Sequence, residues 1–126
     1  LTPAPCLRRV RRLEEDGIIS RYTGIINQEA MGLKVMAFVH VSLMSHTEKT
    51  LTLLDAFVGS NDCITECYSI SGEHDFMLKI LATDIAEVEE FLLQRLMSLN
   101  IVRNANTTFV LSERKRITSI PIRAPT

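Results

Sequence analysis

The sequence predicts an α+β protein in which a short basic helix precedes a ferredoxin-like domain. After residue 33 the apolar spacing changes in the order strand, helix, strand, strand, helix, strand, which is the order of a βαββαβ unit. Before residue 33, a single short helical pattern carries four arginines. We therefore expect two parts, residues 1–32 and residues 33–126.

The overall composition is that of an ordinary folded protein. Hydrophobic residues make up 46 % of the 126 residues and charged residues 23 %, which argues against a disordered chain. The apolar runs are too short to span a bilayer. The three cysteines lack the spacing of a disulfide framework. Because disulfides mark proteins of oxidising compartments, we expect a protein of the reducing cytoplasm. Cys63 and Cys67 are not spaced as a zinc pair and have no third ligand nearby, so we expect no metal. We expect no cofactor either.

The first helix is expected from Thr2 to Asp16. Thr2 is a suitable N-cap, prolines suit the first turn, and Gly17 suits the end of a helix. An apolar stripe runs along one side, and arginines fill the other faces: Leu7, Val10 and Leu13, then Arg8, Arg9, Arg11 and Arg12. Either these arginines bind an anionic partner, or they form a solvated face paired with the acids at 14–16.

Residues 18–26 form two short β-prone runs around a polar centre, which predicts a small hairpin. Residues 27–33 are expected to be a connector. The strand expected at 34–43 is apolar on both faces, which is typical of a strand covered on both sides.

Two amphipathic helices are expected in the ferredoxin-like part. Thr47 caps the first, which ends at Gly59, while Asp84 and Glu87 form a capping box for the second. A last strand is expected at 103–111, followed by a polar and partly basic tail at 112–126.

Two helices cover one face of a four-stranded sheet, so we expect a second subunit on the other face.

A hairpin spans residues 63–81, with the polar loop Ser71–Asp75 at its tip. In its second strand Phe76, Leu78 and Ile80 are expected to share an apolar face. In its first strand Ile64, Tyr68 and Ile70 are expected to share a face. The loop is either an ordinary turn, because Gly and Asp favour turns, or the wall of a small-molecule site.

Two segments of this chain strongly resemble the Lrp/AsnC family of regulators, also called feast/famine proteins. The first is TPAPCLRRVRRLEEDGIISRYTGIIN at residues 2–27, which is similar to the family's recognition helix and wing. The second is the Ser-Gly-x-x-Asp hairpin motif, present here as Ser71, Gly72 and Asp75. The resemblance implies a partial winged helix-turn-helix, N-terminally truncated, followed by a ferredoxin-like effector domain.

The resemblance also implies an amino-acid-responsive transcriptional regulator that binds double-stranded operator DNA. Its recognition helix would present Thr2, Ala4, Arg8, Arg9 and Arg12 to DNA. A free amino acid, leucine or methionine, would bind between dimers that assemble into an octamer. The ligand-binding residues that the resemblance and the hairpin together suggest are Tyr68, Ile70, Ser71, Gly72, Glu73, His74, Asp75 and Met97.

Two other functions fit a ferredoxin-like domain. Small dimeric enzymes use the same fold, because a fold alone does not decide a function. A stand-alone amino-acid-sensing domain is the other alternative. The arginine-rich helix favours the regulator, since an enzyme has no need of it.

Overall fold

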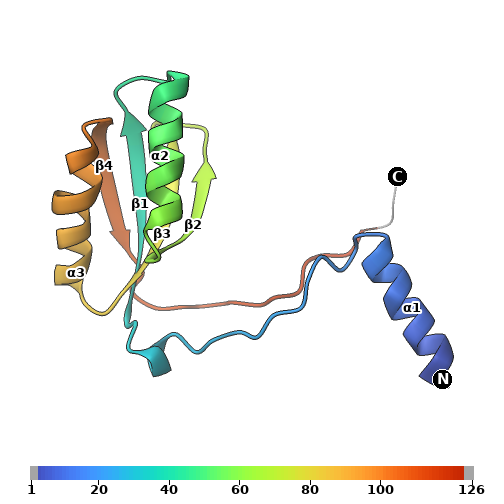
Figure 1. Ribbon diagram of the computed structural model, residues 1–126. Helices are drawn as coiled ribbons and strands as arrows, with labels where there is room; N and C mark the ends of the chain where they lie inside the picture. Colours follow the sequence, from blue (N-terminus) through green and yellow to red (C-terminus); the bar gives the residue numbers. More distant parts are fainter. Residues whose placement is uncertain (1–2, 124–126) are drawn as a thin grey trace.

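The computed structural model describes residues 3–123, and its centre is a four-stranded antiparallel sheet in the order β2-β3-β1-β4 (Figure 1). β1 spans Val35–Leu43 and pairs with both β3, Phe76–Ala82, and β4, Val102–Phe109. β2, Ile64–Ser69, forms one edge by pairing with β3. This is the predicted ferredoxin-like arrangement.

The helices lie together on one face of the sheet (Figure 1). α2 spans Glu48–Ser60, and α3 spans Ile85–Glu90. The chain then continues through the π-helical turn η2, Phe91–Leu96, and the 3-10 turn η3, Met97–Leu99. Alternate residues of the central strands meet these helices in a core that includes Val39, Val41, Leu54, Leu78, Ile80, Phe91 and Leu96.

The two helix starts follow the sequence prediction with one difference. The Thr47 side chain accepts a hydrogen bond from the Thr50 backbone N–H, and Asp84 accepts one from the Glu87 N–H at 2.8 Å. The Glu87 carboxylate, however, accepts hydrogen bonds from the N–H and hydroxyl of Thr83. The reciprocal half of the capping box therefore reaches one residue before the N-cap.

The π-helical turn sets the spacing of buried residues in the second helix. Phe91 is 1 % exposed and Leu96 is fully buried, although they lie five positions apart. In a π-helix the hydrogen bonds join residues five positions apart. Residues with that spacing, such as Phe91 and Leu96, therefore lie on roughly the same side of the helix. Leu93, between them, faces solvent with 72 % of its surface exposed.

α1 spans Pro3–Glu15 and stands apart from the sheet (Figure 1). The Thr2 cap expected from the sequence lies outside the described residues. Gly17 follows in a left-handed conformation with φ of 75°, as expected of a helix end. The apolar stripe remains uncovered, with Leu7 half exposed.

The hairpin predicted for residues 18–26 was wrong. These residues form no strand and run as an extended linker to the short turn η1, Glu29–Met31. An isolated two-stranded hairpin is at best marginally stable, and this one has no third strand or helix face to pack on.

The predicted face of Tyr68 was also wrong. β2 slips in register between Ile64 and Glu66, so Ile64 pairs with Ile80 while Tyr68 pairs with Met77. Because Ile80 and Met77 point to opposite faces of β3, the slip places Tyr68 on the face away from the helices. Within residues 3–123, no helix has the length and apolar character needed to cross a membrane.

Candidate effector loop and DNA-binding helix

The loop between β2 and β3 lies at the end of the sheet where β1 stops. The Ile70 N–H donates to the Asp75 carbonyl at 2.9 Å, which closes the base of the loop. The Asp75 N–H in turn donates to the Val41 carbonyl at 2.8 Å. The backbone of the loop is thereby joined to the central strand.

The Asp75 carboxylate makes a second connection to β1. Its Oδ2 accepts a hydrogen bond from the Leu43 backbone N–H at 2.8 Å and lies 3.0 Å from Nε2 of His46. The Leu43 N–H, and after it His46, lower the pKa of this carboxyl below its usual value. Asp75 therefore acts first as a structural tie between the loop and the residues before α2.

His74 forms a third tie on the same side. Its Nδ1 lies 3.0 Å from Oγ of Ser42, a residue only 6 % exposed. Its ring centroid lies 5.7 Å from that of His40 on β1. Across residues 3–123, no group of three His, Cys, Asp or Glu side chains has the arrangement of a metal site.

The first half of the loop, by contrast, is open. Ser71, Gly72 and Glu73 are all exposed. Gly72 has φ of +110°, and a Cβ placed there would meet nothing within 4 Å. The loop therefore offers backbone groups to solvent between two fixed ends, which suits contact with a small polar ligand.

Ile70 is half-buried at the base of the loop, but the other two predicted ligand contacts lie farther away. Tyr68 is on the helix-free face, where its hydroxyl donates to Glu66 and Glu66 pairs with Lys79 at 2.8 Å. Met97 lies in η3, which leads into β4 at the opposite edge of the sheet from β2. The structure thus brings residues 70–75 together and leaves Tyr68 and Met97 outside that group.

The sequence reasoning missed Ser42, Leu43 and His46 as supports of the loop. Asp75 and Leu43 are 32 positions apart in the chain, and a backbone N–H leaves no signal in the sequence. The one available hint was that β1 and β3 are neighbours in a ferredoxin-like sheet, which brings the end of β1 near the start of β3.

On α1, the residues predicted to face DNA are all exposed apart from Thr2, which is outside the described residues. Ala4, Arg8 and Arg12 follow one another at intervals of four, so they share one side of the helix. Arg9 lies at the border of that side. Arg12 forms an exposed ion pair with Asp16 at 3.7 Å, and the other arginines remain available to an anionic partner.

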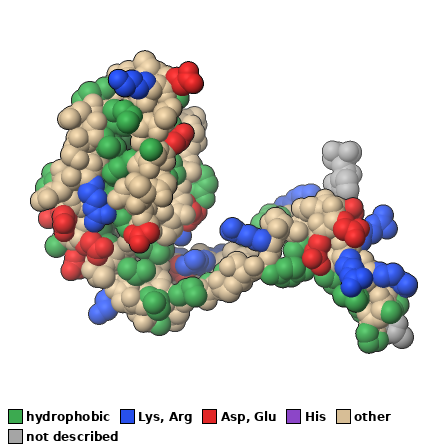
Figure 2. Space-filling view, viewed as in Figure 1, with side chains coloured by type: hydrophobic (Ala, Val, Ile, Leu, Met, Phe, Trp, Pro, Cys, Tyr) green, Lys and Arg blue, Asp and Glu red, His purple; other side chains and the backbone are tan. Residues whose placement is uncertain are grey.

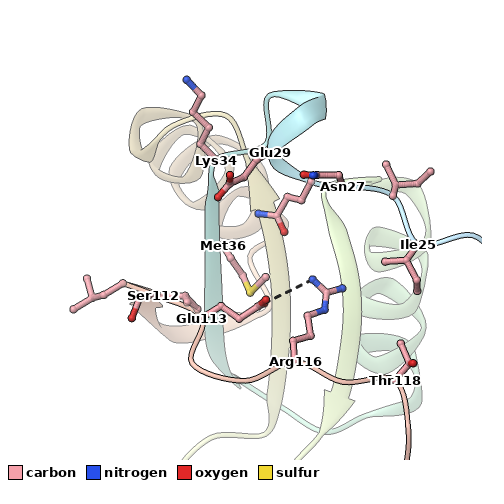
Figure 3. A pocket seen from close by; sticks show the side chains of 13 residues that line it. Ile25, Asn27, Glu29, Lys34, Met36, Ser112, Glu113, Arg116 and Thr118 are labelled. Carbon is pink, nitrogen blue, oxygen red and sulfur yellow. Dashed lines mark ion pairs between the residues drawn. The ribbon is translucent and has the colours of Figure 1, made fainter.

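A cavity of about 520 Å³ lies at the other end of β1, away from the loop (Figure 3). The linker residues 25–29 and the tail residues 110–118 frame it, with Met36 of β1 at its base and Lys34 beside it. Glu113 and Arg116 of the tail pair within it at 3.8 Å. This open, mixed-charge space is the second candidate for a ligand site.

Both the sheet domain and the N-terminal helix of this chain match known protein families. A family description of the Lrp/AsnC ligand-binding domain matches residues 36–120, and one of a winged helix-turn-helix DNA-binding module matches residues 1–20. The chain belongs to the Lrp/AsnC family. The predicted regulator is therefore confirmed over an enzyme on the same fold, because the relatives are transcriptional regulators.

Individual Lrp/AsnC relatives match nearly the full chain. The transcriptional regulator AzlB of Bacillus subtilis is 33 % identical over 97 % of this chain and 78 % of its own length. The leucine-responsive regulatory protein of Salmonella typhimurium is 32 % identical over 98 % of this chain and 75 % of its own length.

Solved structures of Lrp/AsnC regulators superpose well on this fold. A Neisseria meningitidis regulator in complex with L-methionine matches with a TM-score of 0.90 and 34 % identity, over 96 % of this chain and 78 % of that one. The feast or famine protein of Mycobacterium tuberculosis, complexed with L-methionine, matches with a TM-score of 0.75 and 28 % identity, over 95 % and 79 % of the two chains.

Proposed function

We propose that the effector of this regulator is leucine or methionine and that it binds at the loop Ser71–Asp75. The neisserial and mycobacterial structures contain methionine, and the Salmonella relative is named for its response to leucine. The observation that carries the proposal is the form of the loop, which is fixed at both ends while Gly72 is left open.

The chemistry of a free amino acid suits this loop. Its carboxylate needs N–H donors, which exposed backbone at residues 71–73 supplies. Its ammonium group needs acceptors. Since Asp75 Oδ2 already serves Leu43 and His46, we assign the ammonium group to the loop carbonyls and the exposed carboxylate of Glu73.

The side chain of the effector would lie against Ile70 and Met97. Burying a four-carbon side chain contributes about 2 kcal/mol, which favours leucine or methionine over small polar amino acids. Because Met97 precedes the far edge strand of its own sheet, we propose that a neighbouring subunit supplies it. The effector would then sit between dimers, four of which form an octamer.

The helix-free face of the sheet is the proposed dimer interface. Met36, Phe38 and Met77 on this face are only half-buried in the single chain. A second copy placed there would remove apolar surface from water. We propose the domain boundary after Gly32, and a cytoplasmic location, where a DNA-binding regulator meets its operator.

We propose that α1 binds operator DNA through Ala4, Arg8, Arg9 and Arg12, with Thr2 preceding them. All the described members of this set are exposed. Arginine at the surface of such a helix reads guanine edges or binds phosphates. The apolar stripe on the opposite side remains for contact with protein.

A thermal-shift screen against the twenty amino acids tests the proposed effector. Leucine or methionine should raise the melting temperature, because a ligand at a hundred times its Kd stabilises the folded state by about 2.7 kcal/mol. Glycine and asparagine serve as controls. A result in which no amino acid shifts the melting temperature contradicts the proposal.

A further inference from the structure

Charge is divided unevenly between the sheet domain and the tail. Residues 33–111 contain five basic and ten acidic side chains, for a net charge of −5. Residues 112–123 contain four basic side chains and one acidic side chain, for a net charge of +3. The basic ones are Arg114, Lys115, Arg116 and Arg123. A segment this basic is not needed to keep an acidic domain in solution.

The basic tail is fully available to a partner. Every residue from 111 to 123 is exposed, and the segment forms neither helix nor strand. Arg116 pairs with Glu113 at 3.8 Å, whereas Arg114 and Lys115 have no ion pair within residues 3–123. Arg114 and Lys115 are therefore two cations of the segment without an ion-pair partner among the described residues, and Arg123 is a third.

The tail also runs toward the DNA-binding part. It follows the linker away from the sheet (Figure 1), and tail residues as far as Thr118 line the same cavity as Ile25 and Ile26. Figure 2 shows basic side chains along the linker and α1, where a few acidic side chains also lie, and several acidic side chains at the lower part of the sheet domain. The tail thus continues the basic side of the molecule that begins at α1.

We propose that residues 114–123 form a second DNA-contacting segment that binds backbone phosphates beside the site bound by α1. An acidic sheet domain repels a polyanion, so a basic segment between that domain and α1 offsets the repulsion where DNA would pass. Backbone contacts of this kind position a protein without reading sequence. The inference rests on DNA binding by α1 and is independent of the effector and its loop.

The test compares two variants with the same loss of charge. Arg114→Gln/Lys115→Gln changes the tail, and Lys49→Gln/Arg95→Gln changes the helix side of the sheet domain by the same two residue types. Binding to a random-sequence 30-base-pair duplex is followed by fluorescence anisotropy over a range of salt concentrations. The slope of log K against log salt is negative, and each lost phosphate contact reduces its magnitude by about 0.9. The tail variant should therefore lose about two units of slope, while the control variant keeps the wild-type slope.

Other outcomes overturn the inference. Equal slopes for the two variants would place the tail away from DNA. A changed oligomeric state of the tail variant in light scattering, with an unchanged slope, would assign the tail to a subunit contact. Absence of duplex binding by the wild-type chain at low salt would also contradict it. A thermal shift by methionine in the tail variant shows separately that the effector proposal is intact.

Discussion

The carboxylate of Asp75 accepts a hydrogen bond from the backbone N–H of Leu43 at 2.8 Å. This contact joins the start of β3 to the end of β1, and the 3.0 Å contact with Nε2 of His46 extends it toward the first turn of α2. The contact gives a family motif residue a structural role that is separate from ligand binding.

The lowered pKa of Asp75 predicts a contribution to stability that depends on pH. A carboxyl whose pKa is depressed by folding stabilises the protein above its unfolded-state pKa, near 4, and this contribution is lost as the pH falls through the folded value. The melting temperature of the wild type should therefore fall more steeply below about pH 5 than that of Asp75→Asn. Calorimetry from pH 7 to pH 3 measures both. If the melting temperatures of the two proteins fell in parallel with pH, the charge of Asp75 would not stabilise the folded state.

The π-helical turn predicts opposite results for the same substitution at two nearby positions. Leu96 is fully buried and Leu93 is 72 % exposed. Leu96→Ala should lower the free energy of unfolding by about 2–5 kcal/mol, because it leaves a cavity. Leu93→Ala should change it by less than about 0.5 kcal/mol. Urea denaturation measures both, and similar losses would contradict the observed π-helical spacing.

The proposed dimer interface predicts that a charge on the helix-free face separates the subunits. Phe38→Asp places a carboxylate at the middle strand of that face, while Leu53→Asp makes the same kind of change on exposed α2. Light scattering at micromolar concentration should show a smaller species for the first variant alone. A stable wild-type monomer would refute the proposed interface.

The DNA-binding helix predicts a direct contribution of Arg9 to operator binding. Arg9→Ala should weaken binding to operator DNA, selected from a random pool by the wild type, by about 1–3 kcal/mol if Arg9 contacts a base. A loss that is equal on random DNA, with a salt slope lower by about one, would indicate a phosphate contact instead. Lys49→Ala, an exposed position on α2 of the sheet domain, is the control. Unchanged affinity on both DNAs would remove Arg9 from the interface.

The sequence predicted the order of strands and helices along the chain because that order depends on local apolar spacing, and the βαββαβ order in turn implied the ferredoxin-like sheet. Phe76, Leu78 and Ile80 alternate, and they share a face in the structure as expected. The register slip after Ile64 carries no such signal, and it reversed the face of Tyr68. The linker at 18–26 shows the same limit, since β-prone residues form a hairpin only where other structure supports it.

The candidate loop was predicted from its residues, but the way it is held was not. Gly72 and Asp75 stand out in the sequence, and the left-handed backbone at Gly72 agrees with the choice of glycine. The partners of Asp75 and His74 come from β1 and from the residues before α2. Contacts between positions so far apart follow from the fold, so they became visible only once the strands were placed.

The most direct test of the effector loop is calorimetry with L-methionine on three proteins. Gly72→Val and Gly32→Val both place a side chain at a positive φ in open space, so both strain the backbone without a steric clash. Only Gly72 lies in the proposed site. Wild type and Gly32→Val should bind methionine alike, whereas Gly72→Val should lose at least about tenfold in affinity, or 1.4 kcal/mol. Equal binding by all three proteins would contradict a methionine site at the loop Ser71–Asp75. The cavity at Met36 would then be the remaining candidate site.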